Sequence, residues 1–184
     1  MMNRAISVCC QSREGLATMV ELVIVQEADK VAMQRGMGNL EALLGVSVPT
    51  GWPQFPEAFM PSGVEAPADN QWPSYFFVCR QEGSLVGSGG FAGSQDASGE
   101  VEIGYEIAPA FQNRGYATAA VSEMLKYAFS KEDVRGVVAH TLAEANASNA
   151  VLKKAGFEFA GSVLNSEMGP VWQWRLARPK SLSK

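Results

Sequence analysis

The sequence predicts a mixed α/β domain with one largely antiparallel central sheet and flanking helices. Residues 100–107 alternate strictly between polar and apolar side chains, which is the pattern of a strand. Residues 117–129 place apolar side chains at intervals of three and four, which is the pattern of an amphipathic helix. The expected order is strand, helices, three strands, helix, strand, helix and two strands, without the regular alternation of a doubly wound fold.

The length of 184 residues and the hydrophobic content of 47% fit a single globular domain. We expect this domain over residues 19–180, because Met19 directly precedes the first convincing strand. Residues 1–18 are then expected to be a mobile leader or an upstream start. With a net charge of −4 and scattered Lys and Arg, the chain lacks the basic stripe that nucleic-acid backbones require.

The cysteines and the apolar runs indicate the cellular compartment of the protein. Cys9, Cys10 and Cys79 fit neither a disulfide framework nor the spacing of a metal site. No apolar run of the sequence approaches the roughly 18 residues of a membrane span, and polar residues interrupt the first 20 positions, unlike a secretory signal. We therefore expect a soluble cytoplasmic protein without a metal, a membrane partner or a nucleic-acid partner.

The first half of the chain contains an aperiodic segment between regular elements. A β-branched strand at 21–25 precedes helical stretches that end at glycines, and a hairpin follows the aperiodic segment. The helices are expected at 29–36 and 39–44, and the hairpin strands at 75–80 and 85–91 around the turn 81–84. Between them, residues 46–73 are rich in proline and aromatic residues. This long loop is either the wall of a binding site or an aromatic-anchored cover over one core edge.

The second half begins with the strand at 100–107, whose two faces differ. Val101, Ile103, Tyr105 and Ile107 share one face, while Glu100, Glu102 and Glu106 share the other. Further strands are expected at 134–142, 157–164 and 171–178. Asn146 or Ser148 can cap a helix that stops at Gly156.

The connection between Ile107 and Ala117 has the features of an anion site. The first N–H groups of a helix have no intrahelical acceptor and lie at the positive end of its dipole, so they can hold a phosphate. Gly115 permits close approach of the backbone, and Ala117 keeps the next turn clear. The alternative is an ordinary strand-to-helix connection.

Two motifs in this region resemble signatures of the GNAT N-acetyltransferase superfamily. Gln112-Asn113-Arg114-Gly115-Tyr116-Ala117, after the strand 102–109, resembles the acetyl-coenzyme A pyrophosphate loop. His140-Thr141-Leu142 followed by Asn146 to Phe157 resembles the second signature of the RimJ/RimL-type branch, the ribosomal-protein N-terminal acetyltransferases. The resemblance covers about residues 20–178 and is firmest from residue 75 onward.

The resemblance implies a GNAT-like fold, acetyl-coenzyme A as the acetyl donor, and a set of cofactor contacts. The backbone of Ile107 would meet the pantetheine arm, and Asn146 and Ser148 would touch the cofactor from the second helix. Strand 100–107 would splay from strand 134–142 and leave a slot for the thioester. The pyrophosphate would lie on the segment formed by Gln112, Asn113, Arg114, Gly115, Tyr116, Ala117 and Thr118.

Direct transfer to an amine needs a neutral nucleophile, stabilisation of the oxyanion and a proton for the departing thiolate. Glu102 and Glu106 are candidates for the base, with a solvated strand face as the alternative, and a backbone N–H near Ile107 could serve the oxyanion. Many superfamily members carry a tyrosine as thiol acid on the second helix, but residues 151–153 here are Val, Leu and Lys. His140 could be the thiol acid, a base or a structural residue.

The acceptor and the partners are less defined by the sequence. The clustered glutamates suit a cationic amine, either a protein N-terminus or a small polyamine-like molecule. The missing tyrosine leaves a second hypothesis open, a catalytically weak acyl-coenzyme A sensor or interaction module. A homodimer is plausible because the strands at 157–164 and 171–178 could expose an edge. Tyr105, Tyr116 and Cys79 are expected to pack in the core.

Overall fold

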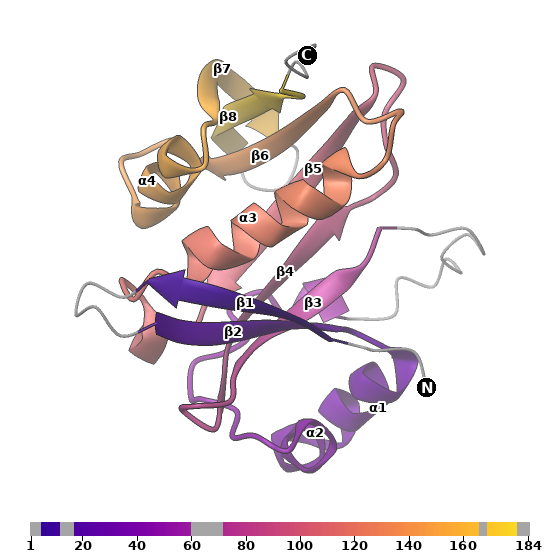
Figure 1. Ribbon diagram of the computed structural model, residues 1–184, viewed down its shortest axis with the longest axis vertical. Coiled ribbons are helices and arrows are strands. Elements are labelled where there is room, and N and C mark those ends of the chain that lie inside the picture. Colours follow the sequence, from indigo (N-terminus) through magenta and orange to yellow (C-terminus); the bar gives the residue numbers. More distant parts are fainter. Residues whose placement is uncertain (1–4, 12–16, 60–71, 166–168, 180–184) are drawn as a thin grey trace. The chain divides into compact units, whose positions relative to one another are not determined.

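A computed structural model describes residues 5–11, 17–59, 72–165 and 169–179. The chain divides into two compact units, Met1–Gly90 with Tyr105–Ala120, and Phe91–Gly104 with Val121–Lys184. Strands and helices are present in both units, so the mixed α/β class is confirmed (Figure 1). None of the helices among the described residues combines the length and the apolar character needed to cross a bilayer.

The first unit contains consecutive antiparallel strands. β1 (Ala5–Gln11), β2 (Ala17–Ile24), β3 (Ser74–Cys79) and β4 (Ser84–Ala92) pair in that order. β1 and β2 run side by side in indigo in Figure 1. Residues 1–18 were expected to be a mobile leader or an upstream start, whereas residues 5–11 form β1 and β2 starts at Ala17, before the expected residue 21. The extent of the domain stays a prediction.

Two short helices follow β2, as expected from their glycine stops. α1 covers Glu27–Arg35 and α2 covers Met37–Leu44, and they lie against each other in Figure 1. Gly36 (φ 120°) separates them, and Gly45 ends α2 in the left-handed region (φ 67°), where residues with a Cβ are disfavoured. Leu40 and Leu44 turn into the hydrophobic core of this unit.

The described part of the long loop is an ordered cover over this core. Ser47 forms a bridge with Ser84, and a 3-10 helix spans Pro56–Phe59. The rings of Trp52 and Phe59 are buried, with centroids 5.8 and 5.6 Å from that of Phe76. The core-covering interpretation is therefore confirmed for Trp52 and Phe59, and the rest of the expected loop at 60–71 lies outside the described residues.

The second unit contains the pairing order β5-β6-β8-β7, in which residues 100–104 of β5 take part. β5 (Glu100–Ile107) runs parallel to β6 (Gly136–Leu142), with pairs from Glu100↔Gly136 to Ile103↔Ala139. β8 (Gly169–Ala177) is antiparallel to both β6 and β7 (Glu158–Asn165). α4 (Ala147–Lys154) belongs to this unit, while α3 (Tyr116–Phe129) begins in the first unit and continues in the second.

β5 has the predicted bounds, but its exposure differs from the predicted faces. Val101 and Ile103 are buried as expected, each 2% exposed. Tyr105 is only half-buried, and Glu106 is buried although the alternation placed it on the polar face. The solvated-face alternative is therefore wrong for Glu106. The reason is that the backbone N–H of Gln54 and the hydroxyl of Ser88 in β4 contact its carboxylate.

Candidate active site

The segment that joins β5 to α3 has a fixed backbone in the first unit. A 3-10 turn at Pro109–Phe111 leads to Gln112, whose Nε2 donates to the carbonyl oxygen of Ile107 at 3.1 Å. Asn113 and Gly115 both adopt the left-handed region, at φ 62° and 87°. α3 begins at Tyr116, so the amides of its first turn follow directly after this bend. The strand, turn and helix start predicted for an anion site are all present.

Glu82, in the turn between β3 and β4, contacts this segment through its carboxylate. Glu82 Oε1 accepts hydrogen bonds from Arg114 Nη1 at 2.7 Å and from the Tyr116 hydroxyl at 3.3 Å. The charge of Glu82 raises the pKa of the Arg114 guanidinium further above its ordinary value. Arg114 also lies over the Phe111 ring, 5.5 Å from its centroid. The Arg114 side chain is thus turned toward a protein carboxylate.

Tyr116 is a packing residue, as predicted. Its side chain is 2% exposed and its ring meets that of Phe111 edge-on at 6.3 Å. Burial raises the pKa of the Tyr116 phenol, and a hydrogen bond to Cys79 adds to this rise. Cys79 is a free and fully buried thiol, as predicted. Ala117 and Thr118 are half-buried on the first turn of α3.

Glu106 is the centre of a buried polar network in the first unit. Its Oε2 accepts from the backbone N–H of Gln54 at 2.8 Å, and its Oε1 accepts from Ser88 Oγ at 3.1 Å. Ser88 Oγ in turn accepts from Trp52 Nε1 at 3.1 Å. Sequence reasoning missed Ser88 and Gln54, because a serine among strand glycines and a backbone amide in an aperiodic segment carry no sequence signal.

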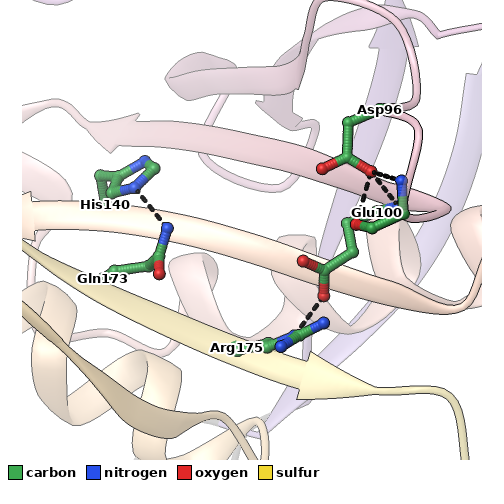
Figure 2. A network of polar contacts seen from close by, with 6 residues as sticks. Asp96, Glu100, His140, Gln173 and Arg175 are labelled. Carbon is green, nitrogen blue, oxygen red and sulfur yellow. Dashed lines mark hydrogen bonds and ion pairs between the residues drawn. The ribbon is translucent and has the colours of Figure 1, made fainter. Parts of the chain in front are cut away.

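Glu102 has a different partner, in the second unit. Its Oε1 lies 2.8 Å from His140 Nδ1, and its side chain is 42% exposed. His140 Nε2 lies 3.2 Å from Gln173 Nε2 of β8, as Figure 2 shows. Because the Gln173 amide nitrogen can only donate, His140 Nε2 accepts and Nδ1–H donates to Glu102. Glu102, His140 and Gln173 therefore form one polar chain across three strands.

Two further polar contacts hold the start of β5 in the second unit. Arg175 of β8 pairs with Glu100 on the same side of the sheet, as Figure 2 shows. The Asp96 carboxylate accepts a hydrogen bond from the amide of Glu100 at 2.9 Å. This hydrogen bond and a second one from the Ser98 hydroxyl lower the pKa of the Asp96 carboxyl. These contacts fix the start of β5, where no catalytic role was predicted.

The start of α4 carries the second set of predicted cofactor residues. Asn146 is the N-cap, because its side chain accepts from the amide of Asn149 at 3.1 Å. Ser148, the other predicted cap, is half-buried within the helix. Asn149 donates to the carbonyl oxygen of Glu144, while its buried Oδ1 has no partner among the described residues. Gly156 follows the helix with φ 90°, as its predicted role as a stop requires.

The predicted residues thus form two groups. Glu106, Ile107 and the whole segment 112–118 belong to the first unit, while Glu102, His140, Asn146 and Ser148 belong to the second. The structure brings Glu102 together with His140, and it brings Glu106 together with the loop at residues 52–54.

Comparisons with known proteins found a matching family model and two curated relatives. Residues 48–158 match the family model described as acetyltransferase (GNAT) domain. The uncharacterized N-acetyltransferase YjdG of Bacillus subtilis (strain 168) is 28% identical over 101 residues, 55% of this chain and 57% of that protein. The uncharacterized N-acetyltransferase YoaA of the same strain is 33% identical over 82 residues, 45% of this chain and 46% of that protein. These matches span about half the length of either relative.

A solved structure extends the likeness to almost the whole chain. Mycobacterium smegmatis RimJ in complex with CoA-disulfide superimposes with a TM-score of 0.64 at 20% identity. The match covers 94% of this chain and 86% of that one, which shows a shared fold. The resemblance stated from two motifs is therefore confirmed, and the protein belongs to the acetyltransferase (GNAT) domain family.

Proposed function

We propose that this protein is an N-acetyltransferase that moves an acetyl group from acetyl-coenzyme A to a primary amine within a ternary complex. The observation that carries the proposal is the backbone of residues 112–118. Two left-handed residues turn the chain directly into the first amides of α3, where a pyrophosphate would be held by N–H groups and the helix dipole. The bound coenzyme in the RimJ structure supports the same donor.

The residues present fit acetyl-coenzyme A without any basic cluster. Because Glu82 holds the Arg114 guanidinium, the backbone of Asn113 to Thr118 would supply the phosphate contacts. The Ile107 backbone would meet the pantetheine arm, and Asn146 and Ser148 would add contacts from α4. The coenzyme supplies an activated thioester.

The transfer needs a base, and the two candidate carboxylates differ in availability. The amine nitrogen attacks the acetyl carbon, the carbon–sulfur bond breaks, and the thiolate takes a proton from water or from a protein acid. Glu102 is the more accessible base, with a side chain that is 42% exposed and shares a hydrogen bond with His140. Glu106 is the second candidate, but it already accepts two hydrogen bonds.

The acceptor is proposed to be a cationic amine, a protein N-terminus or a small polyamine-like molecule. Carboxylates on β5 would attract such a group and could take its proton. We place the activity in the cytoplasm, since the free buried thiol of Cys79 fits a reducing compartment. A homodimer through β7 is also proposed, because β7 ends the strand order and most of its side chains are exposed.

A second candidate function is an acyl-coenzyme A sensor or interaction module. The observation that favours it is on α4, where residues 151–153 supply no tyrosine hydroxyl as a thiol acid. Leu152 is fully buried, and the Lys153 ammonium lies 5.7 Å from the centroid of the Trp174 ring. A sensor would bind acetyl-coenzyme A and release no free thiol with any amine.

Calorimetric titration with acetyl-coenzyme A tests the binding step. A substitution at Gly115 would mix obstruction with backbone strain, since its φ is 87°. Ala117→Glu is cleaner, because an acidic residue in the first turn favours the helix while its charge repels a pyrophosphate. Ala117→Gln is the matched neutral control. We expect the glutamate variant to bind at least tenfold more weakly than the glutamine variant, by roughly 1.4 kcal/mol or more.

Thiol release with an amine panel then separates enzyme from sensor. The panel contains spermidine and a short peptide with a free N-terminal serine. Release above the rate of hydrolysis supports the enzyme. Binding without release supports the sensor, and absence of binding by the wild-type protein contradicts both.

A further inference from the structure

We infer that Glu106 is a positioning residue whose carboxylate fixes residues 51–54 as one rim of the amine acceptor site. The inference rests on the proposed acetyltransferase function and separates the two candidate carboxylates of β5. Two hydrogen-bond donors of the first compact unit, the Gln54 N–H and the Ser88 hydroxyl, contact the Glu106 carboxylate.

Chemistry determines the direction of two hydrogen bonds in this network, because their donors cannot accept. The indole N–H of Trp52 can only donate, so Ser88 Oγ accepts it at 3.1 Å. The Ser88 hydroxyl proton is then available for Glu106 Oε1, also at 3.1 Å. The backbone N–H of Gln54 can only donate, and it meets Oε2 at 2.8 Å. Both carboxylate oxygens therefore act as acceptors, which is the pattern of an ionised carboxylate.

A base in this position would have to accept a proton on an oxygen that already faces a donor. Protonation of Oε2 on the side that faces Gln54 would set its hydrogen against the Gln54 N–H, which can only donate. Protonation of Oε1 would require the Ser88 hydroxyl to turn away and accept instead of donate. With Glu106 only 9% exposed and Ser88 only 2%, water cannot readily replace either partner. The geometry thus favours a permanent anchor over a group that takes up and releases protons.

The anchored segment lies along the end of β5 and the start of the loop to α3. Trp52 packs its ring against Phe59 and Phe76, with centroid distances of 5.6 and 5.8 Å. A methyl group on Gly51 would be 3.6 Å from Pro109 Cγ, so Gly51 is adjacent to the residue that opens the 3-10 turn. Residues 51–54 are therefore held at Pro109 on one side and at Glu106 on the other.

This placement gives the segment a role toward the acceptor. In the proposed function, residues 112–118 take the pyrophosphate and the Ile107 backbone takes the pantetheine arm. Gln54 contacts β5 at Glu106, immediately before Ile107. A rim fixed there would set how the amine approaches the acetyl carbon, and Glu106 would act on the reaction through that rim.

The test is a steady-state comparison of Glu106→Gln with the wild-type protein, using acetyl-coenzyme A and spermidine or the N-terminal serine peptide, whichever the wild type acetylates. The glutamine keeps an acceptor for Ser88 but sets an N–H₂ group against the Gln54 N–H. We expect the acceptor KM to rise about tenfold or more, the size of losing one hydrogen bond to a charged group. The acetyl-coenzyme A Kd should not change, and the pH profile of kcat should keep its wild-type limb.

Ser88→Ala is the second variant, because it removes one donor and leaves the carboxylate in place. Ser84→Ala is its matched control, since Ser84 is another buried serine of β4 and donates to the carbonyls of Ser47 and Leu85. Hydrogen exchange at the Gln54 amide should accelerate in both Glu106→Gln and Ser88→Ala, and should stay at the wild-type rate in Ser84→Ala. The acceptor KM should follow the same order.

Three outcomes would overturn the inference. A kcat that collapses in Glu106→Gln with loss of a limb of the pH profile would make Glu106 the base. An unchanged acceptor KM in an active Glu106→Gln variant would refute the role of Glu106 in fixing the rim, while the proposed acetyltransferase function would stand. A wild-type protein that does not bind acetyl-coenzyme A would refute the proposed function, and this inference with it.

Discussion

The backbone at Asn113 provides a direct way to perturb the proposed pyrophosphate loop. At φ 62°, this residue is in the left-handed region, which costs an ordinary L-residue roughly 1–2 kcal/mol. Asparagine tolerates this conformation better than alanine does. Asn113→Ala should therefore lose about 1 kcal/mol, either from the free energy of unfolding or from binding if the loop relaxes. In the second case the acetyl-coenzyme A Kd rises about fivefold.

Asn113→Gly is the matched variant, because it also removes the side chain but adopts positive φ freely. Urea unfolding and calorimetric titration of both variants measure the two parts of the loss. We expect the glycine variant to retain wild-type affinity for acetyl-coenzyme A. The reasoning fails if the alanine variant matches the wild type in both measurements, or if the glycine variant loses as much affinity as the alanine variant.

Three further predictions concern packing, pH and the base. Gly87→Ala should lower the free energy of unfolding by about 2 kcal/mol or more, because its Cβ would lie 2.3 Å from the Glu106 carbonyl oxygen. The control is Gly104→Ala, whose Cβ meets no described atom within 4 Å and should change the free energy of unfolding little. Urea melts measure both. The raised pKa of Tyr116 means that the folded protein keeps this proton when the unfolded chain releases it. The contribution of Tyr116 to stability should thus be constant below about pH 10 and be lost as the pH rises further, so stability above pH 10 should fall less steeply in Tyr116→Phe. Glu102→Gln should lower kcat about 100-fold or more with an unchanged acetyl-coenzyme A Kd, if Glu102 is the base; an equal rate would reject that role.

Elements with a strong period were predictable from the sequence. The alternation at 100–107 gave the bounds of β5, and the apolar stripe after Gly115 gave α3 to within one residue of its start. The glycines at 36, 45 and 156 marked helix ends because each adopts positive φ there. The candidate loop at 112–118 was recognisable from its resemblance to the acetyl-coenzyme A pyrophosphate loop of the GNAT superfamily, because glycine and a helix start alone also fit an ordinary connection.

Long-range supports could not be predicted in this way. Glu82 lies in a hairpin turn where a charged residue is expected for solvation alone, yet it accepts hydrogen bonds from Arg114 and Tyr116, more than 30 positions away. Likewise, His140 meets Glu102 and Gln173 only because β6 lies between β5 and β8. Neither contact is encoded in local spacing, so both follow only from the strand order.

Glu106 shows most clearly why strand periodicity has a limit. A period of two determines which side chains share a face, but it does not determine whether a second layer covers that face. Here the aperiodic residues 52–54 and a serine of β4 cover the end of the polar face, and they bring donors rather than apolar groups. A carboxylate can be buried in such a place only because each donor meets one of its oxygens. The same burial that makes Glu106 look like an active-site acid is therefore the reason to assign it a positioning role and to leave proton transfer to the more exposed Glu102.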